Sequence, residues 1–99
     1  LSIDCTSNPA TTSTTFVIAH DRSGNNLDVE IEVFDISGRP VWKHSESGVA
    51  SSGTYTVDWD LTGDGGGRLS TGVYIYRVKI GGDGSGMVSK AKKLIIMTR

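Results

Sequence analysis

The residues of this sequence best suited to chemistry lie in a short acidic stretch before a glycine-rich loop. Asp60, Thr62 and Asp64 alternate, and a glycine occupies the sixth position counted from Asp60. Oxygen ligands at alternate positions followed by such a glycine are the pattern of a helix-flanked calcium loop. The twelfth position is Thr71, where that motif needs a bidentate glutamate. Two hypotheses follow: a weak calcium site from Asp58, Asp60 or Asp64, or a turn whose carboxylates bond backbone amides.

Two histidines and one cysteine are the other groups suited to metal binding or covalent catalysis. His20 and His44 are far apart in sequence and have no partner at ligand spacing, whereas a zinc site needs three or four ligands. Cys5 is the single cysteine, so it is either a free thiol or, in an exported protein, a partner for a neighbouring domain. No Gly-x-Ser-x-Gly elbow and no phosphate-binding loop occur. The sequence therefore predicts no catalytic residue, no cofactor and no established metal ligand.

Trp42 is the remaining candidate for ligand binding. If it lies on an exposed face near Val73 or Ile75, it could form an aromatic platform for a sugar. It could instead fill the core or contact a preceding domain. We favour core or domain contact, because large exposed apolar patches are uncommon on monomers.

Two segments flank the acidic, glycine-rich loop and must position its residues. In residues 53–60, Tyr55, Val57 and Trp59 alternate with polar residues, which predicts a half-buried strand. Residues 72–80 form the second segment, whose buried face is expected to carry Tyr74, Tyr76, Val78 and Ile80. Large aromatic side chains bury roughly 150–250 Å² each, so these two strands should supply much of the core.

Further alternating segments predict an all-β fold. Residues 27–33 are the clearest strand, and Asp35–Arg39 is a hairpin turn in which Gly38 supplies the positive φ. Polar turns are predicted at residues 21–26, 47–52 and 81–86. The other expected strands are residues 14–20, 40–46 and 87–97, the last pairing with 72–80. About seven strands at this spacing predict an antiparallel β-sandwich.

Length and composition limit what the chain can be. Its 99 residues make one domain, with residues 1–7 as a short strand or linker remnant. The net charge of −1 favours neither nucleic acid nor an anionic membrane as a partner. No apolar run approaches the ~20 residues that a membrane-spanning helix needs. Because the chain begins at Leu1 without a signal peptide, we expect it to be a fragment of a larger protein.

Three motifs carry a family resemblance over roughly residues 8–97. They are Val57-Asp58-Trp59-Asp60, the segment Gly72–Val78 (GVYIYRV) and the segment Val33–Arg39 (VFDISGR). Together they resemble the C-terminal immunoglobulin-like module of bacterial exported proteins. Similar modules occur in the flagellar hook-capping protein and in the C-terminal domains of type IX-secreted Bacteroidetes proteins. The whole span resembles most the tail of gingipain-type cysteine peptidases, notably the secretion-system sortase.

This resemblance implies an immunoglobulin-like sandwich that is not itself an enzyme. The expected function is type IX secretion sorting, or a retained structural or docking role in a peptidase-type protein. Expected partners are the preceding domains of the same polypeptide and the type IX machinery at the outer membrane, and the expected location is the cell surface or outer membrane. Lys90–Met97 is the expected contact, because a terminal strand can be docked by strand addition. The alternative hypothesis is a carbohydrate-binding β-sandwich module.

Overall fold

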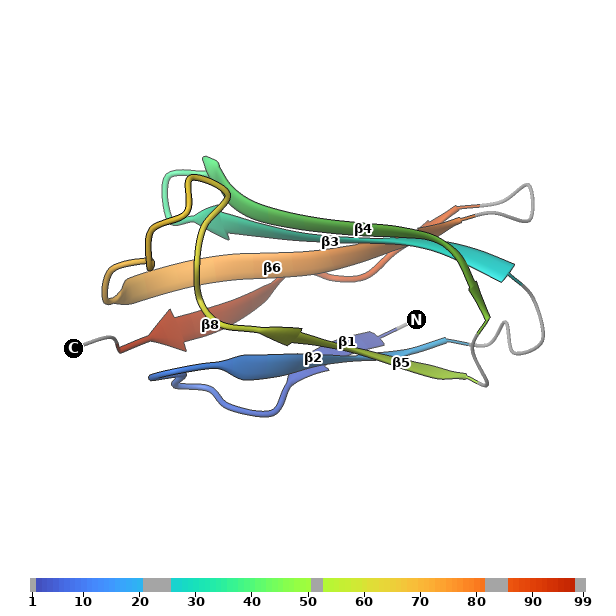
Figure 1. Ribbon diagram of the computed structural model, residues 1–99, viewed down its shortest axis with the longest axis horizontal. Helices are drawn as coiled ribbons and strands as arrows, with labels where there is room; N and C mark the ends of the chain where they lie inside the picture. Colours follow the sequence, from blue (N-terminus) through green and yellow to red (C-terminus); the bar gives the residue numbers. More distant parts are fainter. Residues whose placement is uncertain (1, 21–25, 51–52, 82–85, 98–99) are drawn as a thin grey trace.

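The computed structural model describes residues 2–20, 26–50, 53–81 and 86–97, and in these ranges every regular element is a strand. Figure 1 shows the strands stacked as two layers. The strands are β1 (Ser2–Cys5), β2 (Thr14–Ala19), β3 (Asn26–Asp35), β4 (Pro40–Ala50), β5 (Thr54–Trp59), β6 (Gly72–Gly81), β7 (Met87–Val88) and β8 (Lys92–Ile96). A search of the described residues for a helix long and apolar enough to span a bilayer found none.

The two layers are antiparallel sheets, as predicted. The smaller sheet has the order β1-β2-β5, and the larger has the order β4-β3-β6-β7 with β8 also paired to β6. β7 and β8 lie along successive parts of β6 and together occupy one edge position: Val88 is opposite Lys79, and Ile96 is opposite Gly72. Counted this way, the described residues form seven strand positions, in agreement with the prediction of about seven strands.

The predicted strand over residues 87–97 is interrupted at Ser89. Its backbone N–H donates to the carbonyl of Val78, and its buried hydroxyl oxygen accepts the Val78 N–H at 3.0 Å. The side chain thus takes the place of a backbone carbonyl in the ladder, and the chain turns away from β6 before β8 begins. β4 is longer than predicted. It continues to Ala50, although a loop was expected over residues 47–52. The turns predicted at 21–26 and 81–86 lie largely outside the described residues.

The core is made by the alternating apolar residues of both sheets. Phe16, at its centre, is fully buried and has its ring centroid 5.3 Å from that of Tyr76 and 5.8 Å from that of Trp59. The predicted buried faces of β3 and β6 are confirmed by Leu27, Val29, Ile31, Val33, Tyr74, Tyr76, Val78 and Ile80. Tyr55 is only half-buried, at the rim of the sandwich, where its hydroxyl donates to a carboxylate oxygen of Glu46 at 2.7 Å. Burial of the hydroxyl group has the largest effect on the pKa of Tyr55, and together with this hydrogen bond it raises that pKa to about 12.

The β3–β4 hairpin has the predicted turn. Gly38 has a φ of 90°, and one carboxylate oxygen of Asp35 accepts hydrogen bonds from the N–H and hydroxyl of Ser37 and from the N–H of Arg39. These hydrogen bonds lower the pKa of Asp35, and the bond from the Ser37 hydroxyl has the largest effect. The turn is therefore organised by local chemistry that a sequence motif can reveal.

Candidate functional site

The acidic stretch before the glycine-rich loop organises backbone and neighbouring strands. Asp60 accepts the Thr62 N–H at 3.1 Å, and Asp64 accepts the Lys43 N–H at 3.5 Å. Asp58 accepts a hydrogen bond from the Thr15 hydroxyl at 2.7 Å. Across the described ranges, no three His, Cys, Asp or Glu side chains come close enough to hold a metal ion. These bonds support the turn hypothesis for Asp60 and a strand-capping role for Asp64.

The two histidines lie in different environments. The imidazole of His44, on β4, stacks on the indole of Trp42 with centroids 5.9 Å apart. Its Nε2 atom is buried, has no hydrogen-bond partner among the described residues and lies 3.7 Å from a Glu46 carboxylate oxygen. His20 follows β2, and its backbone N–H donates to the carbonyl of Gly53. Among the residues that the structure describes, no cluster supplies either histidine with the three or four ligands that a zinc site requires.

Trp42 belongs to the rim of the core. Its indole stacks on that of Trp59 at 4.7 Å between centroids and lies 6.0 Å from the Phe16 ring. Val73 and Ile75 alternate along β6 with core residues, so they project from the opposite face of the larger sheet. The combination of Trp42 with Val73 or Ile75 as a sugar platform is therefore not formed.

Cys5 is half-buried at the end of β1 and packs against the core. Burial raises the pKa of its thiol, an effect only partly offset by hydrogen bonds with Tyr76 and Thr14. Because the thiolate is the reactive form, the thiol is expected to be inert. We expect iodoacetamide at pH 8 to alkylate Cys5 at least about tenfold more slowly in the folded chain than in urea. Equal rates in the two states would contradict this assignment.

The outer edge of β8 is closed by the segment around Asn8 and Pro9. The Asn8 side chain accepts the Ile95 N–H at 3.0 Å and donates to the Lys93 carbonyl at 2.9 Å. Ala10 continues this pairing: its N–H donates to the Ile95 carbonyl, and its carbonyl accepts the Met97 N–H, both at 2.8 Å. Since β6 occupies the other edge, the backbone groups of β8 are engaged on both sides. The expected strand addition at Lys90–Met97 thus conflicts with the structure, because its edge is already occupied.

Although its backbone groups are engaged, β8 has exposed side chains that a partner can contact. Leu94 and Ile96 are fully buried, whereas Ile95 is 38% and Met97 49% exposed. Lys93 is exposed on the same face as Ile95, and Lys92 forms an ion pair with Asp4 of β1 at 2.6 Å. Ile95 and Met97 therefore present apolar surface beside a basic side chain.

A ladder of charges covers the neighbouring part of the same outer face. Glu32 accepts a hydrogen bond from Arg77 at 2.9 Å and lies 3.4 Å from the Lys79 ammonium, while Glu30 lies 3.4 Å from that of Lys43. Burial raises the pKa of Glu32, but the hydrogen bond and charge of Arg77, with those of Lys79, outweigh it and lower the pKa overall. The ladder compensates its own charges, and the β8 end of this face presents exposed apolar side chains beside it.

The fold defines the class of protein to which the chain belongs: an immunoglobulin-like antiparallel β-sandwich. The secretion system C-terminal sorting domain family matches residues 8–97, so the chain belongs to that family. The matched span begins at Asn8 and ends at Met97, the two residues at the limits of the closed β8 edge. Membership identifies the chain as a non-catalytic sorting domain of an exported protein that interacts with a secretion system.

The solved structures that resemble this chain include those of two bacterial proteins. Dimeric latent PorU from Porphyromonas gingivalis is 31% identical with a TM-score of 0.85, covering 98% of this chain and 9% of the PorU chain. FlgD from Xanthomonas campestris, a hook-capping protein of flagellar assembly, is 24% identical with a TM-score of 0.58. That match covers 96% of this chain and 64% of the FlgD chain, and it shows the shared fold. A search of curated proteins found no match.

Sequence reasoning missed the role of Asn8. In the structure its side-chain amide imitates a peptide group against β8, because it accepts one backbone N–H and donates to one backbone carbonyl. Its partners lie 85 and 87 residues further along the chain, so no local pattern could reveal them. The available signal was an amide side chain at the limit of the family-like span, followed by an alternating strand.

Proposed function

We propose that this module is a type IX sorting signal that the outer-membrane machinery recognises through the exposed side chains of β8. The observation that carries the proposal is the row formed by Lys93 and Ile95 on β8 and by Met97 directly after it, where both backbone edges of the strand are engaged. A receptor would therefore read side chains and leave the ladder intact. Apolar side chains beside a lysine provide buried area and a charge for orientation.

The likeness to PorU supports a finer proposal for the parent protein. A peptidase-type polypeptide of the gingipain class would carry this module after its other domains and reach the outer membrane or cell surface. Those preceding domains are the second proposed partner. They could pack on the half-exposed Phe34 and Ile75, which line a cavity of about 350 Å³ on the outer face of the larger sheet. A sorting signal would be removed after export, whereas a retained domain would stay attached. The size of the surface-bound product distinguishes these two outcomes.

The sorting proposal is tested by changing the β8 surface in the full-length protein. Replacing Ile95 and Met97 together with serine is expected to lower the surface-exposed amount at least about tenfold, because the apolar contact with the receptor is lost. Surface exposure is measured by protease treatment of intact cells, with fractionation to locate the retained product. The Val88→Ser variant is the matched control, since Val88 is a 55% exposed apolar residue on the same sheet, away from β8.

Normal surface delivery of the double variant, with the module folded, would overturn recognition through β8. Deleting the terminal strand is a poorer experiment, because Leu94 and Ile96 are fully buried and their loss would unfold the module. The carbohydrate-binding alternative is not favoured, because Trp42 stacks on the indole of Trp59 at the core rim.

A further inference from the structure

β5 is the outermost strand of the smaller sheet, on the side of the sandwich opposite β1. The His20 N–H donates to the Gly53 carbonyl, so the odd-numbered residues of this strand turn their backbone groups toward β2. Because these groups alternate, Thr56 and Asp58 turn theirs away from the sheet. The register with β2 is unbroken from Thr54 to Trp59, which makes this a straight edge without a bulge.

The other sheet edges carry devices that discourage pairing. Asn8 and Ala10 cover β8. At the start of β4, the Asp64 N–H donates to the Val41 carbonyl, and two register shifts interrupt its pairing with β3. β1 has only four residues. Natural sheets protect edges with prolines, bulges, lysines or covering segments, and within the part of the chain that the structure describes β5 has none of these along its length.

A cleft opens beside the Asp58 end of β5. It measures about 360 Å³ and is lined by Ser13, Trp42, Asp58, Trp59 and Asp60. One oxygen of the Asp58 carboxylate accepts the Thr15 hydroxyl, and one oxygen of Asp60 accepts the Thr62 N–H, which leaves each carboxylate a second oxygen for a further donor. The indole surface that lines the cleft can pack against the aliphatic stem of a lysine or arginine side chain, and the carboxylates can bind its charged group.

We propose that the outer edge of β5 accepts an extended, basic peptide segment as an added strand, with one lysine or arginine of that segment in the cleft at Trp42. The added strand would bond the outward backbone groups of Thr56 and Asp58, and this pairing supplies affinity whatever the sequence of the segment. The carboxylates of Asp58 and Asp60 then select for positive charge.

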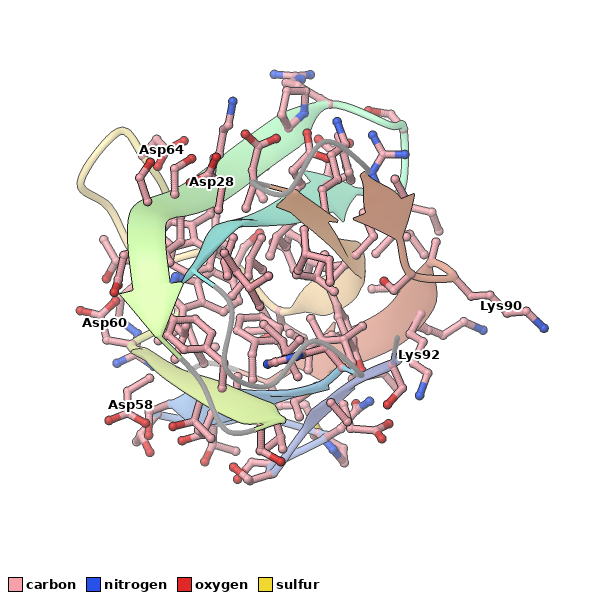
Figure 2. All side chains as sticks on the ribbon, turned by 90° about the vertical axis from the view of Figure 1, so that its right-hand side faces the viewer. Asp28, Asp58, Asp60, Asp64, Lys90 and Lys92 are labelled. Atoms are coloured by element: carbon pink, nitrogen blue, oxygen red, sulfur yellow. The ribbon has the colours of Figure 1, made fainter. Side chains whose placement is uncertain are left out.

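The distribution of charge over the module agrees with a basic partner. Figure 2 shows Asp58, Asp60 and Asp64 along one side of the sandwich, and Lys90 and Lys92 on the opposite side. The edge of β5 therefore lies within the acidic side, away from the β8 surface that we propose the sorting machinery reads. The two proposals involve different strands, so one can fail without the other.

The experiment uses the full-length protein and a synthetic peptide, Lys-Val-Lys-Val-Lys-Val with blocked termini, labelled for fluorescence anisotropy. Thr56→Pro removes the outward N–H and leaves the ladder with β2 intact, since proline is tolerated where a strand's N–H faces solvent. We expect this variant to lower the affinity at least about tenfold, a loss typical of one strong contact. Thr56→Val is the matched control, which keeps the N–H and should change the affinity less than about twofold.

A second variant keeps the proposal testable if Thr56→Pro lowers the melting temperature. Asp60→Lys changes an exposed side chain beyond the end of β5 and should weaken the basic peptide while leaving binding of Thr-Val-Thr-Val-Thr-Val unchanged. Undiminished binding to folded Thr56→Pro, or no binding of the basic peptide at millimolar concentration, would overturn the proposal. Neutral oligosaccharides provide a further test. If they bind, and if Trp42→Ala abolishes this binding whereas Thr56→Pro leaves it intact, the peptide proposal is overturned in favour of a glycan site.

Discussion

Replacing Phe16 with alanine is expected to lower the free energy of unfolding of the chain by about 3–5 kcal/mol. The side chain is fully buried, and its ring lies within 6.0 Å of those of Trp42, Trp59 and Tyr76, measured between centroids. Truncation to alanine removes a ring that contacts aromatic side chains of both sheets. These surrounding rings are rigid and cannot close the resulting cavity. Urea denaturation followed by tryptophan fluorescence measures the loss, and the melting temperature should fall by more than about 10 °C.

Phe34→Ala is the matched control for this prediction. Phe34 is half-buried on the outer face of β3, where the Arg77 guanidinium lies 5.2 Å from its ring centroid. A partly exposed contact of this kind is worth about 1 kcal/mol. A Phe16→Ala variant that is destabilised no more than Phe34→Ala would show that the aromatic cluster does not hold the two sheets together.

Replacing Asn8 with alanine is expected to lower the free energy of unfolding by about 1–2 kcal/mol and to expose the outer edge of β8. The substitution removes the acceptor of the Ile95 N–H and the donor to the Lys93 carbonyl. Amide hydrogen exchange is the sharpest measurement, because the Ile95 N–H loses its partner whereas the Leu94 N–H faces β6. The Ile95 amide should exchange about tenfold faster or more, and the Leu94 amide should change much less.

Asn8→Asp separates the two bonds. The carboxylate still accepts the Ile95 N–H, but at neutral pH it has no proton to donate to the Lys93 carbonyl. We expect Ile95 to stay protected at neutral pH while the chain is less stable than the parent. The difference should shrink at acid pH, because a protonated carboxyl group can donate again. Equal exchange of Ile95 in the parent and in Asn8→Ala would contradict the edge-closing role.

Some of the structure follows from local patterns. The period of two in β3 and β6 places alternate side chains on one face, and those are the side chains found in the core. The Asp35–Arg39 turn depends on a carboxylate and a glycine within five residues, so it too was predictable. The family-like motifs around Trp59 and Tyr74 agree with the match over residues 8–97.

Other features depend on residues brought together from distant parts of the chain. Alternation shows that Trp42 lies on a strand, yet only the packing of β4 against β5 and β2 shows that it stacks on Trp59. The break at Ser89 likewise depends on the position of Val78 across the ladder. Sequence patterns report which face a residue occupies, and they do not report which partner the opposite layer presents.

The amino-acid sequence by itself determined the class of fold and the buried faces, because alternation and motif spacing are local properties. Only the tertiary structure decided which strand edges are closed and which edge is exposed. Closure of β8 depends on Asn8, 85 and 87 residues away from its partners, and exposure of β5 depends on its outermost place in the smaller sheet. An edge is defined by what lies beside a strand, and neighbours across a sandwich are set by the folded chain as a whole.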